Sequence, residues 1–146
     1  MRRLLANPKA LRLGRVVFTP LARLGSVRPQ PYPARGAPKA HATKIGAALF
    51  AGATRARITI APRGAARLVY SDEMNEKLGA GDIAWSAVPS SIVLVACLDK
   101  RGRPRATSFP GGFLFRNDRV CRIRLSVYSG GAGVTRSLPI GFPACG

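Results

Sequence analysis

The chain has 146 residues and a formal net charge of +18, from 24 Lys and Arg against six Asp and Glu. This length favours a single domain, and the lack of any apolar run of about 18 residues excludes a transmembrane helix. With one His and three Cys, the side chains that commonly serve in catalysis and metal binding are scarce. The composition therefore predicts a non-enzymatic protein without a metal or cofactor.

The charge is concentrated in the first half of the chain. All six acidic residues follow residue 71, whereas residues 1–71 hold 14 of the 24 basic residues. Such an asymmetry is typical of a basic segment joined to a more ordinary domain. The partner is unknown, but a segment of this charge would bind a polyanion, such as nucleic acid or an anionic surface, with an affinity that falls as salt rises.

Residues 1–44 are predicted to be a poorly ordered, basic, Pro-rich segment. Proline fixes φ and removes a backbone donor, and residues 28–38 read as an extended linker. A short basic amphipathic helix is expected over residues 9–18. We expect the whole segment to be dispensable for folding, and the natural start of translation to lie downstream of Met1. The prolines that interrupt it are Pro8, Pro20, Pro29, Pro31, Pro33 and Pro38.

Residues 45–55 form a separate apolar stretch. A run of nine largely apolar residues follows Lys44 and ends in small residues such as Ala53. A basic flank, an apolar core and small residues are the ingredients of a secretory signal. The alternative is a buried strand or a short helix, because the run lies more than forty residues into the chain and Arg55 and Arg57 follow closely.

Residues 56–146 are predicted to form a small β-domain. Short strands are expected over residues 57–60 and 67–70, around a turn at Pro62 and Gly64. Residues 71–78 are predicted to form one helix, because Ser71 suits its N-cap and Asp72 and Glu73 suit its first turn.

The remaining strands follow at intervals of about ten residues. Residues 92–98 form a continuous apolar run that predicts a strand buried on both faces. A hairpin is expected between residues 106–109 and 113–116. Residues 120–128 alternate strictly, with Ile123 and Leu125 predicted to face the core and Arg122 and Arg124 the solvent, and residues 134–140 return. The predicted fold is mainly β: a small antiparallel β-sandwich or open barrel with one short helix.

The most specific short motif in the chain is Lys100-Arg101-Gly102-Arg103-Pro104-Arg105. This motif resembles the AT-hook, whose Arg-Gly-Arg-Pro core binds the minor groove of A·T-rich DNA. The resemblance implies that Arg101 and Arg103 follow the groove floor on either side of Gly102, drawn by its negative potential. The alternative is a β-turn that joins two strands and begins at the preceding Asp99.

The three cysteines, Cys97, Cys121 and Cys145, are spaced too widely for a zinc site. A disulfide between Cys121 and Cys145 is favoured, because each lies at the outer end of one of the two paired strands predicted near the C-terminus. With this pairing, Cys97 is expected to be a small apolar core residue, because it lies in the most apolar run. The alternatives are a bond between Cys97 and Cys121, or three reduced thiols. A disulfide would indicate an oxidising compartment.

These observations leave two candidate functions. The first is a structural or interaction role for a disulfide-bonded β-domain, secreted or otherwise outside the cytoplasm. The second is a cytoplasmic nucleic-acid-binding protein that uses the basic N-terminal segment and the loop from Lys100 to Arg105. His41 lies in the Pro-rich segment, where a general base would be poorly held, and Trp85 is expected to be in the core or at its rim.

Overall fold

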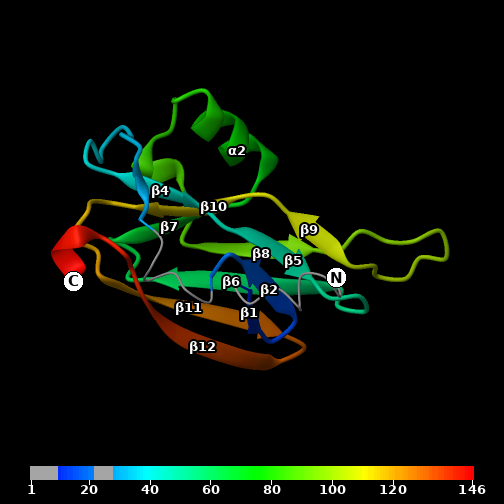
Figure 1. Ribbon diagram of the computed structural model, residues 1–146. Coiled ribbons are helices and arrows are strands. Elements are labelled where there is room, and N and C mark those ends of the chain that lie inside the picture. The colour runs from blue at the N-terminus through cyan, green and yellow to red at the C-terminus, as the bar shows by residue number, and fades with distance from the viewer. Residues whose placement is uncertain (1–9, 22–27) are drawn as a thin grey trace.

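The computed structural model describes residues 10–21 and 28–146, which form three four-stranded antiparallel sheets and one α-helix (Figure 1). The first sheet has the order β1 (Leu11–Leu13), β2 (Val16–Thr19), β5 (Gly46–Leu49), β9 (Thr107–Phe109). The second has the order β3 (Gln30–Pro31), β4 (His41–Lys44), β10 (Gly112–Phe115), β7 (Ala66–Val69). The third has the order β12 (Ala132–Pro139), β11 (Arg122–Ser129), β6 (Arg55–Ala61), β8 (Ser91–Val95). The predicted mainly β, sandwich-like fold with one short helix is confirmed.

The N-terminal segment differs from the expectation wherever the structure describes it. Residues 11–19 form a β-hairpin and not the expected helix, with Gly14 at φ +55° in its turn. Val16 and Phe18 are fully buried, so these strands are part of the core and not of a separate, poorly ordered tail. In β1 the exposed Arg12 separates two apolar residues. The apolar run of β2 is instead buried throughout, a pattern that fits a strand covered on both faces. Of the predicted segment, residues 1–9 and 22–27 lie outside the described residues.

A bent two-stranded ribbon connects the first and second sheets. The strands β4 and β5 follow one another with only Ile45 between them, and β10 and β9 pair with them in the two sheets. At the bend, the backbone N–H of Ile45 donates to the carbonyl oxygen of Gly111, at 2.9 Å. A Cβ on Gly111 would overlap the carbonyl oxygen of Val69, which is why glycine stands at this corner.

The strand pairing in this ribbon contradicts the predicted hairpin and decides between the two interpretations of the apolar run. The predicted hairpin over residues 106–116 is wrong, because β9 and β10 lie in different sheets and pair with β5 and β4 instead of each other. The apolar run that begins at Ile45 contains the buried strand β5, in agreement with the alternative to a signal segment.

The predicted helix is present as α2 (Asp72–Gly79). Ser71 caps it, since its Oγ accepts a hydrogen bond from the backbone N–H of Met74 at 3.1 Å. The strands on either side of Pro62 are also present, as β6 and β7, although they belong to different sheets. After α2, short 3-10 turns cover Trp85–Ala87 and, near the C-terminus, Pro143–Cys145.

The third sheet has one face in the core and one in solvent. On β11, Ile123 and Leu125 are buried while Arg122 and Arg124 are exposed, as predicted. The turn to β12 has positive φ at both Gly130 and Gly131, as a tight two-residue hairpin requires. The prediction for residues 92–98 is wrong, because β8 is an edge strand and its outward side chains, among them Val93 and Val95, are exposed.

Two hydrophobic clusters hold the sheets together. The larger one fills the space enclosed by the three sheets and includes Phe18, Leu125 and Phe113. The smaller one lies between the second sheet and α2 and contains Met74 and Trp85, which confirms the core position expected for Trp85. Helix α2 therefore covers one face of the second sheet (Figure 1).

Candidate functional site

The loop from Asp99 to Arg105, here called the basic loop, is closed by one carboxylate. The backbone N–H groups of Arg101 and Arg103 donate to Oδ1 of Asp99 at 2.8 and 2.9 Å. The Nε of Arg103 also lies 3.2 Å from Oδ2 of Asp99. These donors hold the pKa of the Asp99 carboxyl below its ordinary value, with the N–H of Arg103 the largest cause.

The basic loop is a β-turn, as the alternative to the AT-hook predicted. The N–H of Gly102 donates to the carbonyl oxygen of Asp99 at 3.0 Å, and Gly102 has φ +73°. An AT-hook instead lies extended in the groove. The side chains of Lys100, Arg101 and Arg105 are exposed, and the loop projects from the molecule between β8 and β9 (Figure 1). DNA binding by these residues stays a prediction.

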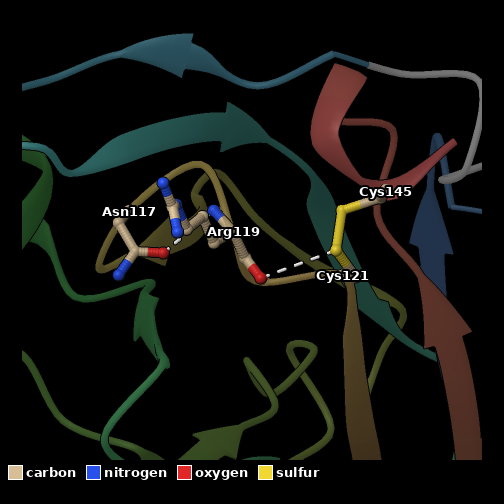
Figure 2. The surroundings of a disulfide bond; sticks show 4 residues. All are labelled: Asn117, Arg119, Cys121 and Cys145. Carbon is tan, nitrogen blue, oxygen red and sulfur yellow. Dashed lines mark hydrogen bonds between the residues drawn. A yellow bond between two sulfur atoms is a disulfide. The ribbon is translucent and has the colours of Figure 1, made fainter.

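The disulfide predicted between Cys121 and Cys145 is present (Figure 2). Its Cα atoms are 5.2 Å apart, within the normal range for a disulfide. The bond ties the start of β11 to the 3-10 turn Pro143–Cys145 that follows β12, as the pairing of these two strands predicted. The preceding turn is ordered by Asn117, whose Oδ1 accepts from the N–H of Arg119 at 2.9 Å.

Cys97 is a free and exposed cysteine. The expectation that it is a small core residue is wrong, because Cys97 continues the outward-facing, exposed positions of Val93 and Val95. Its backbone N–H donates to Oγ1 of Thr107 at 2.9 Å, so the segment is fixed by polar contacts and not by burial of the thiol.

A cleft of about 800 Å³ lies between α2 and the edge of the second sheet. Its apolar walls include Leu78, Val69 and Phe113, and its cationic residues are Arg28 and Lys44. No acidic residue lines it. The chemistry of these walls suits a ligand with an apolar body and a negative group. Sequence reasoning missed the cleft because its walls come from five separate segments of the chain.

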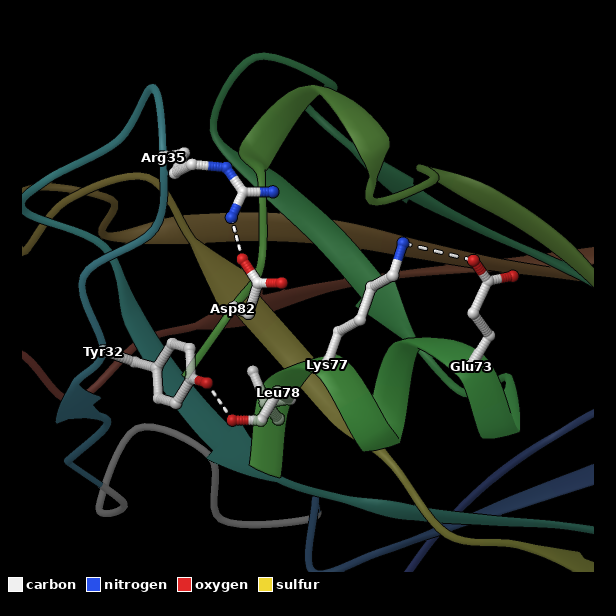
Figure 3. A network of polar contacts seen from close by, with 6 residues as sticks. All are labelled: Tyr32, Arg35, Glu73, Lys77, Leu78 and Asp82. Carbon is white, nitrogen blue, oxygen red and sulfur yellow. Dashed lines mark hydrogen bonds and ion pairs between the residues drawn. The ribbon is translucent and has the colours of Figure 1, made fainter. Parts of the chain in front are cut away.

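Polar contacts fix the helix beside this cleft (Figure 3). The hydroxyl group of Tyr32 donates to the carbonyl oxygen of Leu78 in the last turn of α2. Asn75 donates from Nδ2 to the carbonyl oxygen of Pro110, at 3.0 Å. An ion pair between Arg35 and Asp82 holds the segment after the helix. The cleft is therefore bounded by elements that are tied to one another.

An arginine packs over the buried tryptophan on the same side of the molecule. The guanidinium carbon of Arg67 lies 4.9 Å from the ring centre of Trp85, a favourable cation–π distance. The Nη1 of Arg67 donates to the carbonyl oxygen of Val88 at 2.7 Å. Burial, followed by the neighbouring Arg63 and Arg116, lowers the pKa of Arg67. These contacts explain Arg67 as a structural residue.

Side chains that could bind a metal ion are not gathered in the described part of the chain. Among residues 10–21 and 28–146, no three His, Cys, Asp or Glu side chains lie close enough to hold a metal ion. His41 lies on β4, where its Nδ1 is 2.9 Å from the carbonyl oxygen of Lys39 and its ring packs edge-on against Phe142. Within the same residues, no helix is long and apolar enough to cross a membrane.

Comparisons with protein-family models, with curated proteins and with solved structures find no match to this chain.

Proposed function

We propose that this chain is a non-enzymatic interaction domain that works in an oxidising compartment outside the cytoplasm. The observation that carries the proposal is the disulfide between Cys121 and Cys145. Stable disulfides are typical of extracytoplasmic proteins and rare where thiols are kept reduced. In this chain the bond fastens the C-terminal turn to β11, so it contributes to the fold itself.

Two further observations support binding as the mode of action. The cleft beside α2 is large enough for a small ligand, at about 800 Å³, and the chain carries a charge of +18 that favours anionic partners. The scarcity of acidic and histidine side chains argues against acid–base chemistry. An interaction role requires only the cleft and the cationic surface.

The test is a count of thiols in protein isolated from its native source. Alkylation without a reductant should label one cysteine, Cys97, and alkylation after reduction should label all three. A peptide that joins Cys121 to Cys145 should be recovered from the unreduced digest. Three labelled thiols before reduction would contradict the proposal, provided the sample is alkylated at lysis so that later oxidation is excluded.

A second candidate function is nucleic-acid binding through the basic loop. Its support is that Lys100, Arg101 and Arg105 are exposed on a projecting loop. The test compares binding of A·T-rich and G·C-rich duplexes by the wild type and by Arg103→Ala. A preference for A·T-rich DNA that disappears in the variant would favour the AT-hook mode, whereas equal binding of both duplexes would contradict it.

A further inference from the structure

The outer face of the third sheet carries arginine side chains and no acidic ones. On β6 and β11, every second residue points away from the core, and the outward residues include four exposed arginines: Arg55, Arg57, Arg122 and Arg124. None of the four strands of this sheet contains Asp or Glu. In Figure 1 the sheet lies on the side of the molecule opposite α2, which carries three of the six acidic residues.

The strand register places two cationic positions on either side of a row of hydroxyl groups. Arg57 on β6 lies opposite Tyr128, and Arg124 is four residues from Tyr128 on β11, or about 14 Å along the strand. The row between them crosses all four strands. Its hydroxyl groups are hydrogen-bonded in two pairs, Ser91 with Thr59 at 3.1 Å and Ser126 with Thr135 at 2.8 Å. Its members are Ser91, Thr59, Ser126 and Thr135.

Tyr128 offers an aromatic surface at one end of this face. Tyr128 is 51% exposed. A Cβ on the facing Gly133 would approach two carbon atoms of the ring to 2.7 and 2.8 Å. The ring therefore lies directly over Gly133, as an aromatic side chain does when it shields a glycine backbone, and half of its surface remains open to solvent.

We propose that this face binds single-stranded nucleic acid, with a base stacked on Tyr128 and the backbone phosphates bound by Arg57 and Arg124. Sequence-tolerant binding of single strands combines cationic side chains that follow the backbone with aromatic rings on which bases stack. Serine and threonine hydroxyls are common phosphate contacts, so the row between the arginines extends the path of the strand. A duplex should bind more weakly, because its bases are stacked on each other and present no free face to Tyr128.

This surface is distinct from the basic loop. None of its residues belongs to the segment from Asp99 to Arg105, and none lines the cleft beside α2. Variants of the sheet face and of the basic loop therefore test separate claims. The inference concerns a surface and does not depend on the compartment in which the protein works.

The experiment measures binding of a fluorescent oligothymidylate of about 20 nucleotides to the full, disulfide-bonded chain at several salt concentrations. We expect Arg57→Gln and Arg124→Gln each to weaken binding and to reduce the slope of log K against log salt by about 0.7, the value for one phosphate of a single strand. Arg136→Gln is the matched control, because Arg136 lies opposite the inward-facing Leu125 on the same sheet and is exposed on the other face. Equal losses in all three variants would overturn the proposal.

Tyr128 gives the second arm. Tyr128→Leu should weaken binding at least about fivefold, because it removes base stacking while it still covers Gly133, and Tyr128→Phe should retain it. Fluorescence of the buried Trp85 reports whether each variant is folded. If Tyr128→Leu binds like the wild type, or if heparin and duplex DNA bind as tightly as the single strand, the face is a general polyanion surface and the proposal is wrong. Loss in a Lys100→Gln, Arg101→Gln double variant alone would assign binding to the basic loop instead.

Discussion

The hydroxyl group of Tyr70 donates a hydrogen bond of 2.7 Å to the backbone carbonyl oxygen of Ile45, and both residues are buried. This bond joins the end of β7 to the bend where the chain passes from the second sheet to the first. Burial raises the pKa of Tyr70 well above its ordinary value, which favours the protonated phenol that donates this bond. The contact therefore ties the end of β7 to the bend between β4 and β5.

Tyr70→Phe should lower the free energy of unfolding by about 1–3 kcal/mol, because the carbonyl group of Ile45 would lose its partner in a buried position. Urea denaturation of the two proteins measures the difference. Tyr128→Phe is the control, since Tyr128 is half exposed and its removal leaves no buried carbonyl group without a partner. Equal effects at both tyrosines would contradict a role for the buried bond.

Leu125→Ala should cost about 2–5 kcal/mol of stability, the usual range for a buried leucine. Leu125 is fully buried, whereas its neighbour Arg124 faces solvent. Arg124→Ala should therefore change the stability by no more than about 0.5 kcal/mol. The comparison is made by thermal or urea unfolding, and the opposite order of costs would mean that β11 is shifted by one residue, which exchanges its two faces.

The success of prediction for β11 and its failure for β1 and β2 have one physical explanation. The alternation from Arg122 to Tyr128 is local and long enough to specify both strand and face. In residues 11–19 the pattern covers only three and four residues per strand, and the surrounding prolines and arginines suggested disorder. These strands are stabilised by the pairing of β2 with β5 and by the burial of Phe18. Both depend on residues that are distant in the sequence.

The same distinction applies to the candidate sites. The disulfide and the turn at the basic loop could be predicted, because neighbouring strands and an Asp-Lys-Arg-Gly turn are local features. The cleft and the arginine face could not. Arg57 and Tyr128 are 71 positions apart in the sequence, and only the register of β6 with β11 brings them together.

Phe18→Ala should lower the stability by about 3–5 kcal/mol, as expected for a fully buried aromatic residue. Arg12→Ala on the neighbouring strand is the control. The guanidinium group of Arg12 lies 4.3 Å from the ring centre of Phe50, an exposed contact worth at most about 1 kcal/mol. Chemical denaturation distinguishes the two variants.

Deletion of residues 1–44 should prevent folding, contrary to the expectation from composition. The deletion removes β1–β4 and exposes the edges of β5 and β10 with which β2 and β4 pair. We expect loss of tertiary signals in near-UV circular dichroism. A truncated chain that unfolds at the same midpoint as the full one would restore the view that this segment is dispensable.

Replacement of both Cys121 and Cys145 by alanine should cost about 2–5 kcal/mol, because the disulfide closes a loop with a sequence separation of 24 residues. The reduced wild type should unfold at nearly the same denaturant concentration as this double variant, and the variant should not respond to reductant. Cys97→Ser should change little, since Cys97 is exposed and unpaired. A large effect of reductant on the double variant would show that Cys97 takes part in a bond of its own.

The carboxyl group of Asp99 should titrate below the ordinary value of an aspartate, about 3.9. The ionised form accepts hydrogen bonds from the N–H groups of Arg101 and Arg103, so folding of the basic loop favours the charged state and lowers the pKa. The contribution of Asp99 to stability is therefore present above the unfolded pKa and is lost as the pH falls through the lower, folded pKa. Carbon-detected NMR titration measures the side chain itself, and the amide signals of Arg101 and Arg103 should shift with the same midpoint. Asp99→Asn should abolish that shared transition. A midpoint at or above 3.9, or amides that do not follow it, would mean that the carboxylate does not close this turn in solution.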